Sequence, residues 1–380
     1  MQSRDSVFNV PALRFPEFSG EWESKSLGEI GESLIGLTYS PSDVVKEGGT
    51  IVFRSSNIQN GVMDYGDLVR VSKKIKDAIV TREGDLLICA RNGSTRLIGK
   101  NALLRKSDEG QTFGAFMMVF RSDDNRFVHQ LLSTKAYSTQ VSENLGARIN
   151  QITTRNFAEY TFNMPPIPEE KEKLGVFLEL INDRIETQSK IIEEQETLLN
   201  SLADKMFLQN NFSSQLSELV NIEKGKQLNA DTLSETGDYY VMNGGITPSG
   251  YYSEYNVPAG AISISEGGNS CGYVQFNEKP FWSGGHCYSL QCRTNLVDYK
   301  YIYYYLKTKE ADVMALRIGS GLPNIQKKDI EKFTITYPSL QLQKQFVKTL
   351  DALSGKINTE KNLLEKYCQQ KSYLLSKMFI

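Results

Sequence analysis

The chain has 380 residues, of which 40% are hydrophobic and 23% are charged, and its formal net charge is −2. This composition suits two or three packed domains, excludes a disordered chain and argues against a strongly basic nucleic-acid binder. Five cysteines without a CxxC pair and only two histidines, His129 and His286, argue against a disulfide framework, a zinc ribbon and a histidine metal site.

No apolar run approaches the length that a bilayer requires. The first residues, MQSRDSVFNVPALRFPEF, have no apolar segment after Arg4 of the kind found in a secretion signal. We therefore expect a cytoplasmic protein.

The first 165 residues have the pattern of a mixed α/β globule. Short apolar segments alternate with turn dipeptides such as Asn60-Gly61 and Asn92-Gly93, a pattern that predicts strands and hairpins. One helix is expected at residues 127–141. The strand candidates are residues 51–58, 67–72, 84–90 and 115–120.

A long helix is predicted for residues 166–207. Prolines at its start cost nothing there, because the first N–H groups of a helix have no partner within it. Ten acidic residues against five basic ones indicate a helix that contacts protein rather than phosphate. Apolar residues recur with the 4,3 spacing of a coiled-coil seam, at positions Leu174, Leu178, Ile181, Ile185, Ile192, Leu199 and Leu202.

Residues 208–340 repeat the globular pattern, with a helix expected at residues 299–316. The strand candidates are residues 239–243, 261–265, 271–276 and 287–292. A second long helix follows at residues 341–380. The equivalent seam positions are Phe346, Leu350, Leu353, Ile357, Leu364 and Leu374.

The two halves are copies of one another. The segment GARINQITTRNFAEYTFNMPPI, from Gly146, aligns with GSGLPNIQKKDIEKFTITYPSL, from Gly319, and both helical segments end in Lys-Met-Phe. We therefore expect an α+β fold with an internal pseudo-two-fold repeat, in which two mixed α/β domains are joined by two long helices that form an antiparallel coiled coil. The helices alone leave a plain dimerisation coiled coil open as an alternative.

Polar loops follow corresponding strands in the two globules, RNGSTR at residues 91–96 and EGGNS at residues 266–270. Arg91, Asn92 and Arg96 carry groups that can make two hydrogen bonds at once to a guanine or adenine edge. Gly93 permits close approach of the backbone. For either loop alone, an ordinary solvated hairpin is the simpler interpretation.

Two segments approach catalytic motifs without completing them. GSTRLIGKN, from Gly93, has five residues between its glycines and places Asn101 where a P-loop needs Ser or Thr for Mg²⁺. NMPPI, from Asn163, breaks the Asn-Pro-Pro-aromatic order of amino-methyltransferases, and no glycine-rich cofactor fingerprint follows a first strand. We therefore predict a protein with no catalytic site and no metal site of its own.

The opening PALRFPEFSGEW, from Pro11, the segment KSLGEI, from Lys25, and the junction PPIPEEK, from Pro165, resemble the corresponding parts of specificity subunits of type I restriction-modification systems. The second junction, PSLQLQK from Pro338, is a looser copy. The resemblance covers the whole chain. It divides the chain into a target recognition domain at residues 1–165, a long helix at 166–207, a second target recognition domain at 208–340 and a second long helix at 341–380.

The resemblance implies that each target recognition domain reads one half of a bipartite, asymmetric site in double-stranded DNA and that the paired helices set the spacer. It also implies that the helices bind two methyltransferase (modification) subunits and that restriction subunits join this core. S-adenosylmethionine, ATP and Mg²⁺ would bind those partners, and no cofactor would bind this chain.

The candidate DNA contacts that follow are Arg54, Asn57, Arg91, Asn92, Arg96, Asn150, Gln151, Asn243, Asn269, Ser270, Asn324 and Lys327. Two other functions fit the same pattern. One is an interaction protein that oligomerises through its coiled coil, and the other is a solitary specificity subunit that serves DNA methylation only.

Overall fold

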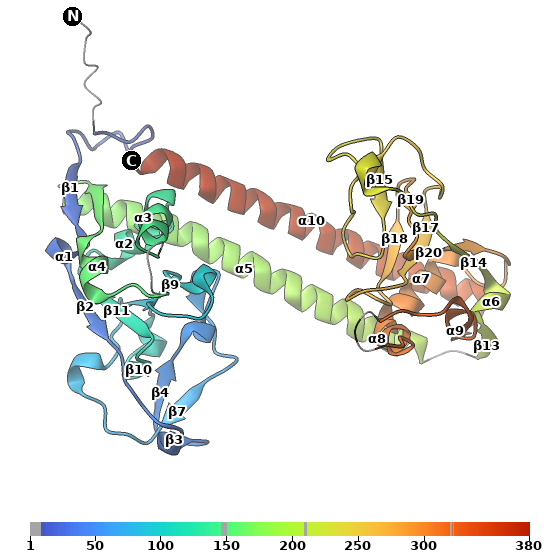
Figure 1. The fold of residues 1–380 in the computed structure, drawn as a ribbon, viewed down its shortest axis with the longest axis horizontal. Coiled ribbons are helices and arrows are strands. Elements are labelled where there is room, and N and C mark those ends of the chain that lie inside the picture. Colours follow the sequence, from blue (N-terminus) through green and yellow to red (C-terminus); the bar gives the residue numbers. More distant parts are fainter. Residues whose placement is uncertain (1–8, 146–149, 209–210, 320, 322) are drawn as a thin grey trace, which may run out of the picture. The chain divides into compact units, whose positions relative to one another are not determined.

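The computed structural model describes residues 9–145, 150–208, 211–319, 321 and 323–380 (Figure 1). The first eight residues, residues 209–210 and parts of the aligned repeat, at 146–149, 320 and 322, lie outside the described residues. The chain divides into two compact units, Met1–Gln188 with Leu363–Ile380, and Ser189–Asn362. Each long helix contributes one part to each unit.

A four-stranded antiparallel sheet of order β2-β11-β8-β9 forms the centre of the first unit. Side chains alternate across β8, so that Leu86 and Ile88 pack into one apolar cluster and Leu87 and Cys89 into another. Both faces of this sheet are therefore covered. The strands are β2 (Glu32–Ile35), β8 (Leu86–Cys89), β9 (Asn101–Leu103) and β11 (Met117–Arg121).

A smaller sheet of order β10-β4-β7-β3 completes the first unit, with β10 parallel to β4 and the other pairs antiparallel. A separate hairpin turns at Asn60-Gly61, both of which have positive φ angles, as this dipeptide predicts. The strands of the small sheet, the hairpin and one further pair are β3 (Val44–Val45), β4 (Thr50–Phe53), β7 (Val69–Val71), β10 (Thr112–Phe113), β5 (Ile58–Gln59), β6 (Val62–Met63), β1 (Glu23–Ser26) and β12 (Thr161–Met164).

The strand expected at residues 51–58 is wrong in its second half, because β4 ends at Phe53 and a short 3-10 helix, η2 (Ser55–Asn57), follows. The amide of Asn57 holds this turn. Its Oδ1 accepts from the backbone N–H of Arg54 at 2.9 Å, and its Nδ2 donates to two backbone carbonyls. A local side-chain bond thus replaces the ladder that a strand would need.

The helix expected at residues 127–141 is two helices, α2 (Asn125–Leu131) and α3 (Lys135–Leu145). Thr134 lies between them, where its hydroxyl donates to the carbonyl of Leu131 at 2.7 Å and accepts from the N–H of Tyr137 at 3.4 Å. The remaining short helices of the first unit are α1 (Leu27–Ile30) and α4 (Thr154–Glu159).

The second unit repeats this arrangement, with a four-stranded antiparallel sheet β14-β20-β17-β18 and a smaller sheet β16-β15-β19. β17 and β20 have the predicted bounds, whereas β18 begins at Val274 because Cys271 and Gly272 lie in the preceding turn. The strands are β14 (Val220–Lys224), β15 (Tyr239–Met242), β16 (Tyr251–Tyr252), β17 (Ala261–Ser265), β18 (Val274–Asn277), β19 (Trp282–Ser283), β20 (Cys287–Cys292) and the paired β13 (Phe212–Gln215) and β21 (Thr334–Tyr337).

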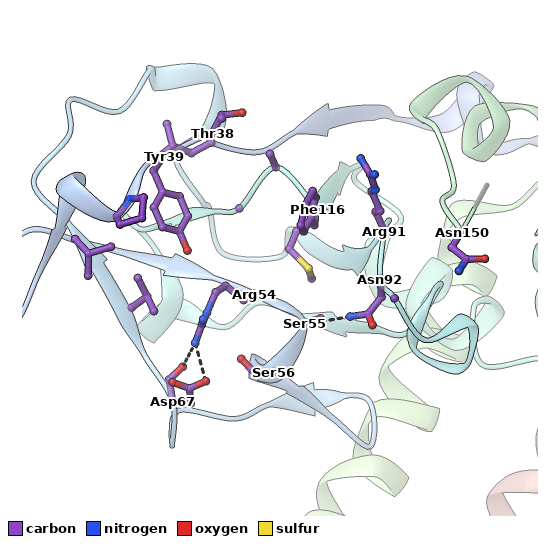
Figure 2. Close-up of a pocket in the computed structure, with 18 residues that line it drawn as sticks. Thr38, Tyr39, Arg54, Ser55, Ser56, Asp67, Arg91, Asn92, Phe116 and Asn150 are labelled. Atoms are coloured by element: carbon purple, nitrogen blue, oxygen red, sulfur yellow. Dashed lines mark hydrogen bonds and ion pairs between the residues drawn. The ribbon is translucent and has the colours of Figure 1, made fainter.

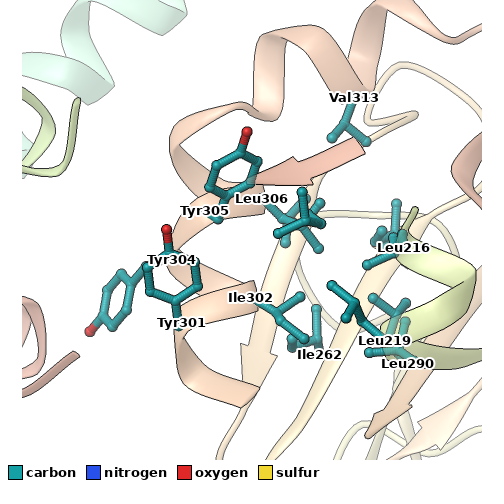
Figure 3. Packing of buried hydrophobic residues seen from close by; sticks show 14 of the residues in the cluster. Leu216, Leu219, Ile262, Leu290, Tyr301, Ile302, Tyr304, Tyr305, Leu306 and Val313 are labelled. Atoms are coloured by element: carbon teal, nitrogen blue, oxygen red, sulfur yellow. The ribbon is translucent and has the colours of Figure 1, made fainter. Parts of the chain in front are cut away.

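The helix expected at residues 299–316 is also divided, at Lys309. Ile302 and Leu306 of the first part lie in one apolar cluster with Ile262 and Leu290 of the sheet (Figure 3). The helices are α6 (Leu216–Leu219), α7 (Tyr299–Thr308), α8 (Glu310–Ala315) and α9 (Lys327–Glu331).

The strand registers define equivalent positions in the two units. Met118 pairs with Ile35 in the first unit, and Tyr288 pairs with Lys224 in the second. Gly36 follows Ile35 and Gly225 follows Lys224, and a Cβ at either glycine would lie 2.3 Å or less from a carbonyl oxygen of the facing segment. Both copies therefore need glycine at this place.

The two long helices are α5 (Pro168–Phe207) and α10 (Leu340–Met378). In the first unit the start of α5 packs against the end of α10, since Leu174 and Leu178 share a cluster with Met378. In the second unit the end of α5 packs against the start of α10, since Phe207 shares a cluster with Phe346. The helices therefore pair with each other and run antiparallel in each unit, so the predicted fold class is confirmed.

The predicted seam positions are buried or half-buried throughout. They are Leu174, Leu178, Ile181, Ile185, Ile192, Leu199 and Leu202 on α5, and Phe346, Leu350, Leu353, Ile357, Leu364 and Leu374 on α10.

Within the described residues, no helix combines the length and apolarity that a membrane crossing needs.

Candidate functional site

A groove of about 1320 Å³ opens on the first unit, where the end of β4, the loop after β8 and the segment before β11 meet (Figure 2). Four of the residues singled out from the sequence line it together. They are Arg54, Asn92, Asn150 and Arg91. The ends of strands from two different sheets bring these segments together, although they lie far apart in the sequence.

Arg91 and Phe116 form an exposed part of this groove. The guanidinium carbon of Arg91 lies 5.2 Å from the ring centroid of Phe116, and the ring is 60% exposed. Their backbones are tied as well, since the N–H of Arg91 donates to the carbonyl of Phe116 at 2.9 Å. A cation held over an aromatic face keeps its outward donors in place for a ligand.

The other polar side chains of the groove are held in place by hydrogen bonds and ion pairs to residues of the groove itself. Asn92 Nδ2 donates to Ser55 Oγ at 3.0 Å, and Asn92 Oδ1 accepts from the N–H of Ser94. Arg54 Nη2 pairs with Asp67 Oδ2 at 2.6 Å, while Arg54 Nε is buried without a hydrogen-bond partner in the part of the chain that the structure describes.

Three candidates of the first unit lie elsewhere. Arg96 is exposed at the end of the loop, in the short 3-10 helix η4 (Thr95–Leu97), outside the lining of the groove. Gln151 bridges to Arg91 and lines a smaller concavity that shares Arg91 and Phe116 with the groove. Asn57 is fully buried and its amide holds a turn, so it does not belong to the exposed surface.

In the second unit, two of the candidates meet at the equivalent place. Asn324 forms a β-bridge with Gly267, as Gln151 does with Arg91. Asn243 Oδ1 accepts from the backbone N–H of His286 at 3.2 Å. Asn269 and Ser270 lie in the turn after β17, and Lys327 opens α9, exposed, with an ion pair of 3.6 Å to Glu331.

A charged cluster at this place in the second unit was not identified from the sequence. Glu266 is 8% exposed, and its carboxylate lies 2.5 Å from Lys224 Nζ, 3.2 Å from the hydroxyl of Tyr288 and 3.4 Å from His286 Nδ1. Burial, with the Glu266 charge next in effect, raises the pKa of Tyr288, which keeps its hydroxyl protonated as a donor. The only sequence signal was the place of Glu266 at the start of the predicted loop.

Titratable groups elsewhere fit structural roles. His129 is buried against α10, and burial together with the nearby Lys371 lowers its pKa to about 4. Burial raises the pKa of the Cys89 thiol. Among the described residues, no group of three or more His, Cys, Asp or Glu side chains is arranged to hold a metal ion.

Comparison with known proteins relates the whole chain to one group. A type I specificity subunit from Mycoplasma pneumoniae is 31% identical over 166 residues, which are 43% of this chain and 44% of that protein. The EcoKI specificity subunit of Escherichia coli K12 is 29% identical over 168 residues, 41% of this chain and 36% of that protein. The aligned regions thus cover less than half of the length of these relatives.

Among solved structures, the fold resembles a type I restriction-modification S subunit from Mycoplasma genitalium, with a TM-score of 0.72, 20% identity and coverage of 98% of this chain and 99% of that one. This likeness supports the fold. A family model described as a type I restriction modification DNA specificity domain matches residues 19–197 and again residues 210–366. These two matches take up most of the sequence, and the chain therefore belongs to the family of type I restriction modification DNA specificity domains.

Proposed function

We propose that this chain is the sequence-recognition subunit of a type I restriction-modification enzyme. Each globular domain binds one half of a bipartite, asymmetric site in double-stranded DNA, and the paired helices set the spacer between the halves. The observation that carries this proposal is the placement of equivalent polar surfaces, around Arg91 and around Gly267, after corresponding inner strands of the central sheets in two tandem specificity domains.

The side chains of these surfaces suit the major groove. Arginine donates two parallel hydrogen bonds to guanine O6 and N7, and asparagine makes a donor and acceptor pair with adenine N6 and N7. Arg91, Asn150, Asn243 and Asn324 supply such groups. Because the net charge of the chain is −2, we expect most of its discrimination to come from base contacts and much of the phosphate binding from partners.

The helices are proposed to carry two methyltransferase subunits, to which restriction subunits attach. Apolar side chains on both helices support a protein partner, since Leu180 is 62% exposed, Leu198 is 56% exposed and Tyr373 is 60% exposed. The proposal assigns no catalysis to this chain, and places S-adenosylmethionine, ATP and Mg²⁺ in the partner subunits.

The test is a map of methylated bases in the DNA of cells that express the methyltransferase subunit with and without this chain. We expect one bipartite motif, two short blocks separated by a fixed gap, to be methylated only when the chain is present. An unchanged methylation map would contradict the proposal. Challenge of the same cells with unmodified phage DNA then separates a restriction enzyme from a solitary specificity subunit that serves methylation only.

A further inference from the structure

The two domains carry different chemistry at three equivalent positions. β11 and β20 have the same register against β8 and β17, so Phe116, just before Met117, corresponds to His286, just before Cys287. The pairings of β2 and β14 make Ile35 correspond to Lys224.

The third position follows from the loop bridges. Arg91 bridges to Gln151 and Gly267 bridges to Asn324, so the residues just before them, Ala90 and Glu266, correspond. Isoleucine, alanine and phenylalanine in the first domain are thus replaced by lysine, glutamate and histidine in the second.

The two sets of residues differ in their capacity for hydrogen bonding and not only in size. In the first domain, Ile35 and Phe116 are each 60% exposed and offer no polar side-chain atom. In the second domain, the side chains of Lys224 and His286 are 51% and 63% exposed, whereas that of Glu266 is only 11% exposed. The buried carboxylate therefore lies beneath two exposed nitrogen-bearing side chains.

The Glu266 carboxylate faces the protein. Lys224 and Tyr288 donate to one oxygen and His286 approaches the other, and its burial leaves it little access to a base. The lysine ammonium has three protons, and only one is directed at the carboxylate. What this arrangement offers outward is the remaining donors of the Lys224 ammonium, held in position by a buried charge that also faces His286.

We infer that Lys224, positioned by Glu266 with His286 on the other carboxylate oxygen, reads a guanine in the half-site of the second domain. Guanine presents two acceptors, N7 and O6, in the major groove, and lysine is one of its usual partners. The first domain lacks this cluster, and there the guanidinium of Arg91 lies over Phe116 instead, so a guanine in its half-site would be read by different chemistry. Glu266 is a positioning residue, since it acts through Lys224.

Because this inference rests on the proposed function, the test first requires that the full chain, bound to its methyltransferase subunit, selects a bipartite site from a pool of random duplexes. Failure of the unaltered complex to select any site counts against the proposed function. The inference itself is tested by Lys224→Ile and His286→Phe, which install the residues of the first domain. Lys279→Ile is the control, because Lys279 is an exposed lysine of the same domain in the loop between β18 and β19.

We expect Lys224→Ile to reduce the preference for one guanine in one half-site by about tenfold or more, with the other half-site and the gap unchanged. His286→Phe removes the group on the other oxygen of Glu266 and is expected to weaken the same preference by a smaller factor. Lys279→Ile is expected to leave the selected bases as they are. A uniform loss of affinity for all sequences, with a shallower salt dependence, would mean that Lys224 contacts phosphate and would overturn the inference. So would an unchanged guanine preference.

Glu266→Gln tests the positioning role. Glutamine keeps an acceptor and the size of the side chain but removes the charge, so the same guanine preference is expected to weaken by a smaller factor than in Lys224→Ile. Thermal unfolding identifies any loss of fold. Transfer of the cluster to the first domain, by Ile35→Lys, Ala90→Glu and Phe116→His together in an Arg91→Ala background, is expected to create a guanine preference in the other half-site that Arg91→Ala alone lacks.

Discussion

At the scale of single residues, the pair formed by Arg91 and Phe116 carries the first prediction. Arg91→Ala removes a group able to make two hydrogen bonds to guanine, and Phe116→Ala removes the ring that holds it. We expect Arg91→Ala to relax one base position in one half-site by about 1–3 kcal/mol. Phe116→Ala is expected to act at the same position with a smaller effect. Selection of bound duplexes by the variant complexes measures both.

Arg96→Ala is the matched control, because Arg96 belongs to the same loop and carries the same charge but lies outside the lining of the groove. The structure therefore favours a smaller change in base preference than in Arg91→Ala. If Arg91→Ala altered both half-sites equally, Arg91 would be a general phosphate contact or a folding residue.

The buried His129 predicts a pH dependence of stability. Its pKa is lowered to about 4, below the ordinary value of 6.5, mainly by burial. Between these two values the unfolded chain binds a proton that the folded chain does not, so stability falls as pH is lowered from about 6.5 to 4, by about 3 kcal/mol in total. Above this pH range the folded chain therefore contains His129 in its neutral form.

The measurement compares urea unfolding of the unaltered chain with that of His129→Gln at pH 7 and pH 4.5. The variant is expected to lose less stability between the two values, because glutamine has no proton to gain. An equal loss in both proteins would show that other groups dominate the acid response.

Residues of the candidate site could be predicted where a local sequence pattern indicated them. Arg91 and Asn92 stand in a glycine loop after an apolar strand, and the structure places both in the groove. Phe116 and Lys224 carry no such signal. Their roles depend on which strands pair, and that register joins residues far apart in the chain.

At the scale of elements, long periodic segments were predicted best. The 4,3 spacing located both long helices, and apolar alternation with turn signals located β17 and β20. Two of the errors fall where one side chain bonds the local backbone. Asn57 ends a strand and Thr134 divides a helix, because each offers the backbone a partner that no periodicity records.

The start of α5 carries the second prediction about stability. Glu170 is fully buried and receives two hydrogen bonds of 2.7 Å from Arg14, together with one from Trp22 Nε1. Glu170→Ala leaves the guanidinium of Arg14 without its carboxylate, while the backbone carbonyls of Gly20 and Ser19 remain as acceptors. We expect it to cost about 3–5 kcal/mol of stability.

A double variant separates the pair from the packing. Arg14→Leu combined with Glu170→Leu removes both charges, and we expect it to be more stable than Glu170→Ala because no buried charge is left unpaired. The midpoint of chemical unfolding measures each variant. A double variant less stable than Glu170→Ala would contradict this account. The second copy has the neutral Gln343 at this place, hydrogen-bonded to the backbone of Asp298 and Pro338.

At the scale of the whole molecule, the paired helices carry a prediction about spacing. Insertion of one heptad after Gln188 and another after Glu360 keeps the apolar seam in phase. Each helix then grows by about 10.5 Å, which corresponds to roughly three base pairs of DNA. We expect selected duplexes to contain the same two half-sites with a longer gap. Affinity is expected to fall, because three base pairs also rotate one half-site by roughly 100° about the duplex axis.

The control inserts the heptad in α5 alone. The two paired helices then differ in length, which is expected to lower the free energy of unfolding. An unchanged gap in the doubly extended chain would show that the helices serve assembly only. Altered half-site bases would show that the extension disturbs the recognition domains themselves.

The first unit is built from two distant parts of the sequence, and its aromatic cluster has a consequence for how the protein is made. Trp22 and Phe127 pack against Phe379, and the N–H of Leu13 donates to the carbonyl of Lys377 at 2.8 Å. The second unit is one continuous segment and can fold as soon as it is synthesised. The domain translated first thus completes its core last, and until residue 379 leaves the ribosome its open face is exposed to aggregation and to chaperones.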